Sequence, residues 1–273
     1  MAGGDEGMSS YILCQTRRAE KPFYIENIST NIYSIEELCY YLYHNLYLID
    51  QTLINEDLCR WIEEELSLPL LAAKLRPHLG KFADIEDILY PIFKEINYLT
   101  YEELRDLNGR LARQGTERLL FRKRRKGDQL MENGMYVNAI RVYRELLDSP
   151  ELSGDEDLTV EARELTAKVR HNLGCAYTRL FQMDKALECF YQAYETSGRD
   201  EDLIDYLIAF RSVRTPIEYE SRLTELAVPP AVKRAVKEKN ERFARIPEKP
   251  VYSQHVDELI AEITRDYHRS TLS

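Results

Sequence analysis

Apolar residues recur every three or four positions along most of the chain, and this spacing places them on one face of an α-helix. Leu58, Trp61, Ile62 and Leu66 form one such set. Strands do not alternate with helices, so a parallel sheet is not expected. The pattern predicts an all-α fold. The predicted helices cover residues 34–48, 84–98, 116–132, 135–148, 158–181, 184–197, 201–213, 216–227, 230–243 and 253–269, with others starting after Asn55, Ser67 and Thr100.

Several helix starts carry capping signals. Ser34 and Thr100 are each followed three positions later by glutamate. In this capping box the two side chains bond backbone N–H groups at the helix start that have no other partner. Asn55 and Ser67 are also predicted N-caps. Pro91 lies inside the predicted helix 84–98, and because proline has no backbone N–H we expect a kink or a break there.

The N-terminal segment has a different pattern. Residues 11–28 contain two short β-prone runs around a charged linker. Strand-forming residues on both sides of a polar linker favour a hairpin. We therefore expect a short N-terminal β-hairpin or extended arm before the first helix.

Residues 171–198 contain small and large side chains in a specific order, and part of that order occurs upstream. The interval from Gly127 to Ala139 equals the interval from Gly174 to Ala186. The segment resembles the tetratricopeptide repeat (TPR), a unit of two helices with about 34 residues. The resemblance implies that Gly174 and Ala186 lie where the two helices cross closely. The residues that carry the resemblance are Leu173, Gly174, Tyr177, Ala186, Phe190, Ala193 and Gly198.

The repeats are irregular. The glycines are 47 positions apart (174 minus 127), which predicts a polar loop and a lengthened first helix in the second unit. A third unit near Glu201 has Ile208 in place of the expected glycine. Repeats bury their faces against neighbours, so flanking helices are expected to cap them. We predict an N-terminal arm or hairpin (1–33), a helical region (34–99), an α-α superhelix of TPR-like hairpins (100–215) and C-terminal capping helices (216–273).

The resemblance also implies a function. TPR proteins are adaptors that bind a peptide or a partner helix in a groove, so we expect a non-catalytic adaptor or scaffold that binds a protein or peptide partner. Fold alone does not identify the partner, and the groove residues have to be argued individually. The predicted partner-binding residues of the groove are Arg124, Asp128, His171, Asn172, Cys175 and Arg179.

Some TPR proteins grip the C-terminal carboxylate of chaperones with Lys, Asn and Arg side chains. Arg124 and Asn172 match two of these positions. Asp128, however, stands where Asn is expected, and the third unit offers Asp202 and Tyr206. This type of clamp is therefore not expected.

The charge distribution is uneven. The chain of 273 residues has a formal net charge of −10, which argues against general attraction to nucleic acid or anionic membranes. Residues 104–126 nevertheless contain nine basic and two acidic residues, a local charge of +7. The predicted basic face consists of Arg113, Arg118, Arg122, Lys123, Arg125 and Lys126.

Three interpretations of the basic face remain open. It can pair with the chain's own acidic block within residues 145–164, bind an acidic protein partner, or bind nucleic acid phosphates. The last two make a nucleic-acid-binding or peptide-sensing regulator the alternative to an adaptor. A structural subunit of an oligomer is a third possibility, and the oligomeric state is left open.

Other chemistry is not indicated. The five cysteines and five histidines are scattered, without a C-x-x-C or H-E-x-x-H pair, and no phosphate-binding glycine loop or nucleophile elbow is present. We expect no metal, no cofactor and no enzymatic activity. The longest apolar runs, such as 68–73, are too short to span a bilayer, and the N-terminus lacks the features of a signal peptide. A cytoplasmic protein without membrane contact is expected.

Overall fold

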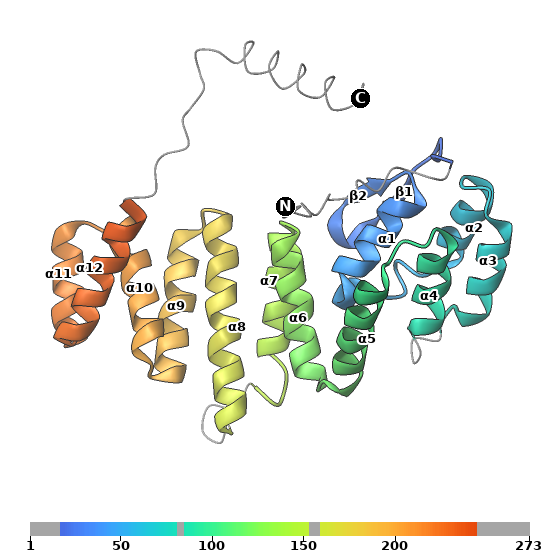
Figure 1. Cartoon of the computed structure of the whole chain (residues 1–273). Coiled ribbons are helices and arrows are strands. Elements are labelled where there is room, and N and C mark those ends of the chain that lie inside the picture. The colour runs from blue at the N-terminus through green and yellow to red at the C-terminus, as the bar shows by residue number, and fades with distance from the viewer. Residues whose placement is uncertain (1–16, 81–84, 153–158, 245–273) are drawn as a thin grey trace, which may run out of the picture. The chain divides into compact units, whose positions relative to one another are not determined.

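The computed structural model describes residues 17–80, 85–152 and 159–244 (Figure 1). Within these ranges the chain forms twelve α-helices, three short 3-10 helices and one two-stranded antiparallel sheet. The prediction of an all-α helical-repeat fold with a small N-terminal hairpin is confirmed. The chain divides within helix α10 (Asp200–Val213) into two compact units, Met1–Asp202 and Leu203–Ser273.

The hairpin lies further along the chain than predicted. Strand β1 (Phe23–Ile25) pairs with β2 (Thr30–Ile32) across the 3-10 helix η1 (Glu26–Ile28). The second predicted run supplies β1, but β2 lies after it, and residues 11–16 are outside the described residues. Thr30 and Asn31 are exposed and only Ile32 is buried, so this short strand carries a weak hydrophobic pattern.

The N-terminal helices follow the hairpin. The capping box of Ser34 and Glu37 starts α1, and Asn55 caps α2 through a bond from the Leu58 N–H at 2.9 Å. Both starts are as predicted. The elements of this region are α1 (Ile35–His44), η2 (Leu46–Leu48), α2 (Glu56–Glu64), α3 (Pro69–Leu75), η3 (Arg76–His78) and α4 (Glu86–Glu95).

Three details of this region differ from the predictions. Helix α1 ends at His44 because the Asn45 side chain donates to the carbonyl of Tyr41 at 3.0 Å. Ser67 is not an N-cap: it has a left-handed backbone (φ 57°), Leu68 is the N-cap, and α3 begins with Pro69. Pro91 lies inside α4, which continues through it without a break.

Helix α5 and two helical hairpins occupy the rest of the first unit. The capping box of Thr100 and Glu103 starts α5, and an extended backbone at Glu117 and Arg118 separates α5 from α6. Helix α8 has 20 residues and α6 has 14, which confirms the lengthened first helix of the second repeat. Helices α6 and α7 pack together, as do α8 and α9 (Figure 1). The elements are α5 (Tyr101–Thr116), α6 (Leu119–Glu132), α7 (Tyr136–Leu147), α8 (Val160–Arg179) and α9 (Met183–Ser197).

The same close contact holds both hairpins together. A methyl group at Gly127 would lie 2.4 Å from Cε1 of Tyr143, and one at Gly174 would lie 2.8 Å from Cε1 of Phe190. In each case the aromatic residue follows the glycine by sixteen positions. The glycine therefore leaves the space that the ring of the second helix fills. This is the packing that the order of small and large residues predicts.

The second unit uses a different crossing. Helix α10 (Asp200–Val213) enters it and is followed by α11 (Pro216–Glu225) and α12 (Pro230–Ala244). Tyr206 and Arg222 are also sixteen positions apart, and Nε of Arg222 donates to the Tyr206 hydroxyl at 2.9 Å. A hydrogen bond between two large side chains thus joins α10 to α11. The predicted helix 253–269 lies outside the described residues.

The glycine contacts yield a stability prediction. Gly174→Ala should lower the free energy of unfolding by about 1–3 kcal/mol, because the added methyl group overlaps the buried Phe190 ring. The control is Gly109→Ala in α5, where a methyl group meets nothing within 4 Å. That change should leave stability equal or raise it by up to about 1 kcal/mol, since alanine favours helix. Urea unfolding of the variants tests this, and equal effects of both would contradict the close crossing.

Candidate partner-binding surfaces

A polar cluster centred on Asp128 joins α6, α7 and α8. Its Oδ1 accepts hydrogen bonds from the Tyr143 hydroxyl and from Nδ2 of Asn172, each at 2.8 Å. Nε of Arg124, one turn earlier in α6, lies 3.4 Å from the other carboxylate oxygen. The structure therefore brings together Arg124, Asp128 and Asn172, three of the predicted groove residues. Tyr143 was not among the predicted groove residues, because an aromatic ring at this position of the repeat is typical of the core.

The electrostatics of the cluster favour a fixed arrangement. Tyr143 is fully buried, and burial together with the carboxylate of Asp128 raises the pKa of its hydroxyl far above the ordinary value. The hydroxyl therefore stays protonated and acts as a donor to Asp128. Asp128 therefore engages Asn172 through a hydrogen bond and Arg124 through an ion pair.

The other predicted groove residues continue along α8. Sγ of Cys175 lies 3.6 Å from Nε2 of His171, and the His171 ring centroid is 5.3 Å from that of Phe190. His171 and Cys175 are partly exposed, and Arg179 in the last turn is exposed. Helical spacing places these three side chains on the same side of α8. Together with Arg124, Asp128 and Asn172 they form what we name the α6–α8 face.

The predicted basic face divides between paired and unpaired side chains. Arg118 pairs with Glu161 at 2.6 Å, Lys126 with Asp50 at 3.0 Å, and Arg125 with Glu117 at 3.6 Å. These pairs connect α6 to α8, to the loop after η2 and to the end of α5. The side chains that are exposed and form no ion pair with any described residue are Arg113, Arg122 and Lys123.

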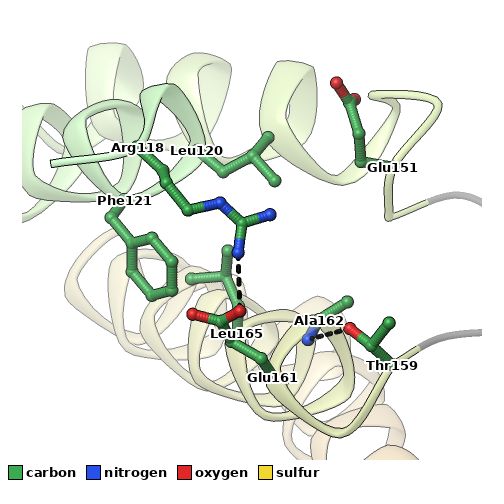
Figure 2. Close-up of a pocket in the computed structure, with 8 residues that line it drawn as sticks. All are labelled: Arg118, Leu120, Phe121, Glu151, Thr159, Glu161, Ala162 and Leu165. Carbon is green, nitrogen blue, oxygen red and sulfur yellow. Dashed lines mark hydrogen bonds and ion pairs between the residues drawn. The ribbon is translucent and has the colours of Figure 1, made fainter.

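One ion pair spans a small cavity at the start of α8. Figure 2 shows Arg118 and Glu161 facing each other there, with Phe121 and Leu165 beside them. The cavity has a volume of about 180 Å³. Thr159 caps α8 next to it by accepting from the Ala162 N–H at 3.2 Å. Because both charged side chains are more than half exposed, the pair orients the lengthened α8 more than it stabilises it.

A larger polar pocket lies between η2, α5 and α6. It has a volume of about 550 Å³. Gln129 fixes one wall by accepting from the Tyr47 N–H at 2.9 Å and donating to the His44 carbonyl at 3.0 Å. We name it the arginine pocket. Its lining residues are Leu46, Tyr47, Arg110, Arg113, Thr116, Glu117, Arg125 and Gln129.

Sequence reasoning missed the arginine pocket because it depends on contacts between distant segments. Tyr47 and Gln129 are 82 positions apart. The only local signal was the excess of arginine in residues 104–126, which shows the charge but not the concave site.

Within residues 17–80, 85–152 and 159–244, no group of three or more His, Cys, Asp or Glu side chains is placed to hold a metal ion. Over the same ranges, no helix combines the length and the apolar character needed to cross a bilayer. Among the described cysteines, Cys39, Cys59 and Cys189 are free thiols.

The Asp128 cluster yields a second prediction. Asp128→Ala should lower the free energy of unfolding by about 1–3 kcal/mol, because the buried Tyr143 hydroxyl loses its acceptor and Arg124 loses its ion-pair partner. Glu132→Ala, an exposed change one turn later in α6, should alter stability by no more than about 0.5 kcal/mol. Thermal and urea unfolding measure both. A neutral Asp128→Ala would show that the cluster contributes nothing to stability.

A third prediction concerns acid stability. Burial alone would raise the pKa of Asp50, but hydrogen bonds from Thr52 and Lys126 outweigh burial and lower it below 3.8. A carboxylate with a lowered pKa stabilises the fold above its unfolded pKa, and this contribution disappears as pH falls through the folded pKa. Asp50→Asn should lower the free energy of unfolding by about 1 kcal/mol at pH 7. Below the folded pKa of Asp50 the variant and the original protein should be equally stable. Urea unfolding of both proteins at several pH values tests this. A difference in the free energy of unfolding that stays constant down to acidic pH would contradict it.

No known protein family matches this chain, and no curated protein or solved structure is significantly similar to it. A function is therefore inferred from the structure of this molecule alone. Two helical hairpins share one type of crossing, a fixed polar cluster links their first helices, and an arginine pocket lies beside them.

Proposed function

We propose that this protein is a non-catalytic adaptor or scaffold of the TPR type, which binds a peptide or helix of a partner protein on its α6–α8 face. The observation that carries this proposal is the repeated glycine–aromatic crossing, Gly127 with Tyr143 and Gly174 with Phe190. It supports equivalent hairpins, and the bond from Asn172 to Asp128 connects their first helices. Repeat proteins bind partners on such extended surfaces of stacked helices.

The residues of the α6–α8 face suit peptide recognition. Asp128 holds Arg124 and Asn172 in place before a partner arrives, which reduces the entropy lost on binding. His171, Cys175 and Arg179 remain accessible and offer polar groups along three turns of α8. Arg179 can form a charged hydrogen bond to a carboxylate, so an acidic peptide is the favoured partner.

The nucleic-acid alternative has weaker support. Binding to a phosphate backbone needs several free cations. Arg118, Arg125 and Lys126 lie within ion-pair distance of Glu161, Glu117 and Asp50. The predicted basic face is thus reduced to three exposed cations without an ion pair to a described residue, Arg113, Arg122 and Lys123. A basic surface of this size also suits an acidic protein. For the location we propose the cytoplasm, because reduced thiols such as those of Cys39, Cys59 and Cys189 are typical of a reducing compartment.

The adaptor proposal is tested by capture of partners. The full chain, immobilised and exposed to a lysate of its native cells, should retain a defined set of proteins identified by mass spectrometry. Arg179→Glu should reduce their recovery by about tenfold, because it reverses a charge on the α6–α8 face. The matched control is Arg163→Glu, the same change at an exposed position on the opposite side of α8.

The two variants separate specific binding from general charge attraction. Recovery that survives Arg163→Glu but not Arg179→Glu places the partner on the α6–α8 face. Equal loss with both variants, or no retained protein at all, would overturn the proposal. Circular dichroism of both variants checks that the fold is intact.

A further inference from the structure

The arginine pocket combines fixed walls with an excess of positive charge. Three guanidinium groups line it, from Arg110 and Arg113 of α5 and Arg125 of α6. Glu117 is the one acidic residue in its lining. The α6–α8 face consists of other residues, so an inference about this pocket does not rest on the function proposed above.

Two of the arginines are held by the molecule itself. Nη1 of Arg110 donates to the carbonyl of Tyr43 at 2.8 Å, and its Nε lies 2.9 Å from the carboxylate of Asp106. The Arg110 guanidinium also lies 4.1 Å from the centre of the Tyr43 ring. Arg125 lies 3.6 Å from Glu117. These contacts place an acidic group beside each of the two guanidinium groups, and the hydrogen bond to Tyr43 also fixes that of Arg110.

The charge of Arg113 is not balanced by an acidic partner among the described residues. This side chain is exposed and forms no ion pair with any described residue. Arg110, Arg113 and Arg125 against Asp106 and Glu117 give three positive and two negative charges, a surplus of one. The pocket therefore has the charge to accept one monovalent anion.

The other walls define the shape of the ligand. Leu46 and Tyr47 supply an apolar and aromatic side, and Gln129 holds the Tyr47 backbone in place. The Tyr47 hydroxyl donates to Glu117 at 2.9 Å, so that carboxylate already has a hydrogen-bond donor within the lining. A volume of about 550 Å³ exceeds what a single small anion fills and leaves room for an adjoining side chain.

We propose that the arginine pocket binds a side-chain carboxylate of an acidic partner peptide, with Arg113 as its main contact and an apolar neighbour of that residue against Leu46 and Tyr47. A guanidinium group can bind a carboxylate with two parallel hydrogen bonds. A phosphate monoester carries a charge of about −1.5 to −2, which the surplus of one does not balance. The charge and the apolar wall together favour an acidic peptide over a phosphorylated one.

The test uses a fluorescein-labelled, C-terminally amidated octapeptide with the sequence Glu-Ala-Glu-Leu repeated twice. Fluorescence anisotropy with the full chain should show saturable binding, and the peptide with glutamine at every glutamate position should not bind. Arg113→Gln should weaken binding by at least about tenfold, because it removes the unbalanced charge. The matched control is Arg105→Gln, an exposed arginine of the same helix that lies outside the pocket and should weaken binding less than about twofold.

Further measurements separate this site from others. Arg163→Gln, an exposed change outside both the arginine pocket and the α6–α8 face, should leave binding of the octapeptide unchanged. Octapeptide binding and partner capture are separate measurements, so failure of the α6–α8 face and failure of the arginine pocket give different results. Equal weakening by Arg113→Gln and Arg105→Gln would overturn the proposal, as would no binding. Tighter binding of the same peptide with phosphoserine, or of single-stranded DNA, would also overturn it.

Discussion

The close contact between a glycine and an aromatic ring determines how the two hairpins are built. At Gly127 and Gly174 the first helix has no side chain, and the ring of Tyr143 or Phe190 fills the space. Aromatic burial contributes to stability, but its geometric effect is equally important, because the ring fixes the distance between two helices. The orientation of α6 and α8, and of every side chain that they expose, depends on this contact.

The polar surface continues from that packing. Asp128 collects a buried hydroxyl, an amide and a guanidinium from three helices. A buried tyrosine needs an acceptor for its hydroxyl, and Asp128 provides it at the edge of the hairpin. The same carboxylate holds Asn172 of the next hairpin. Asp128 therefore accepts the hydrogen bond that the buried Tyr143 needs, and it also links the two hairpins through Asn172.

Helices and their starts could be predicted from local sequence, whereas contacts between segments could not. The capping boxes at Ser34 and Thr100 are local patterns and were predicted correctly. Ser67 was assigned wrongly as an N-cap, because Pro69 fixes the helix start two residues later. Pro91 does not break α4, since helix packing can compensate for one missing hydrogen bond.

The candidate site shows the same limit. Arg124, Asp128 and Asn172 were identified from the repeat pattern, but their mutual contacts were not. The arginine excess was visible in the sequence, while its division into ion pairs and a pocket depends on Asp50, Tyr47 and Gln129 far away in the chain.

A comparison of the two hairpins shows that two positions change together. With the offset of 47 residues, Tyr143 and Asp128 correspond to Phe190 and Cys175. The first ring has a hydroxyl and a carboxylate beside it, whereas the second has neither. A ring without a hydroxyl needs no hydrogen-bond acceptor beside it, so a thiol can stand at position 175 where the first hairpin has an acid. One oxygen atom inside a hairpin thus constrains the chemical group on its outside, and two hairpins with the same architecture can present different surfaces.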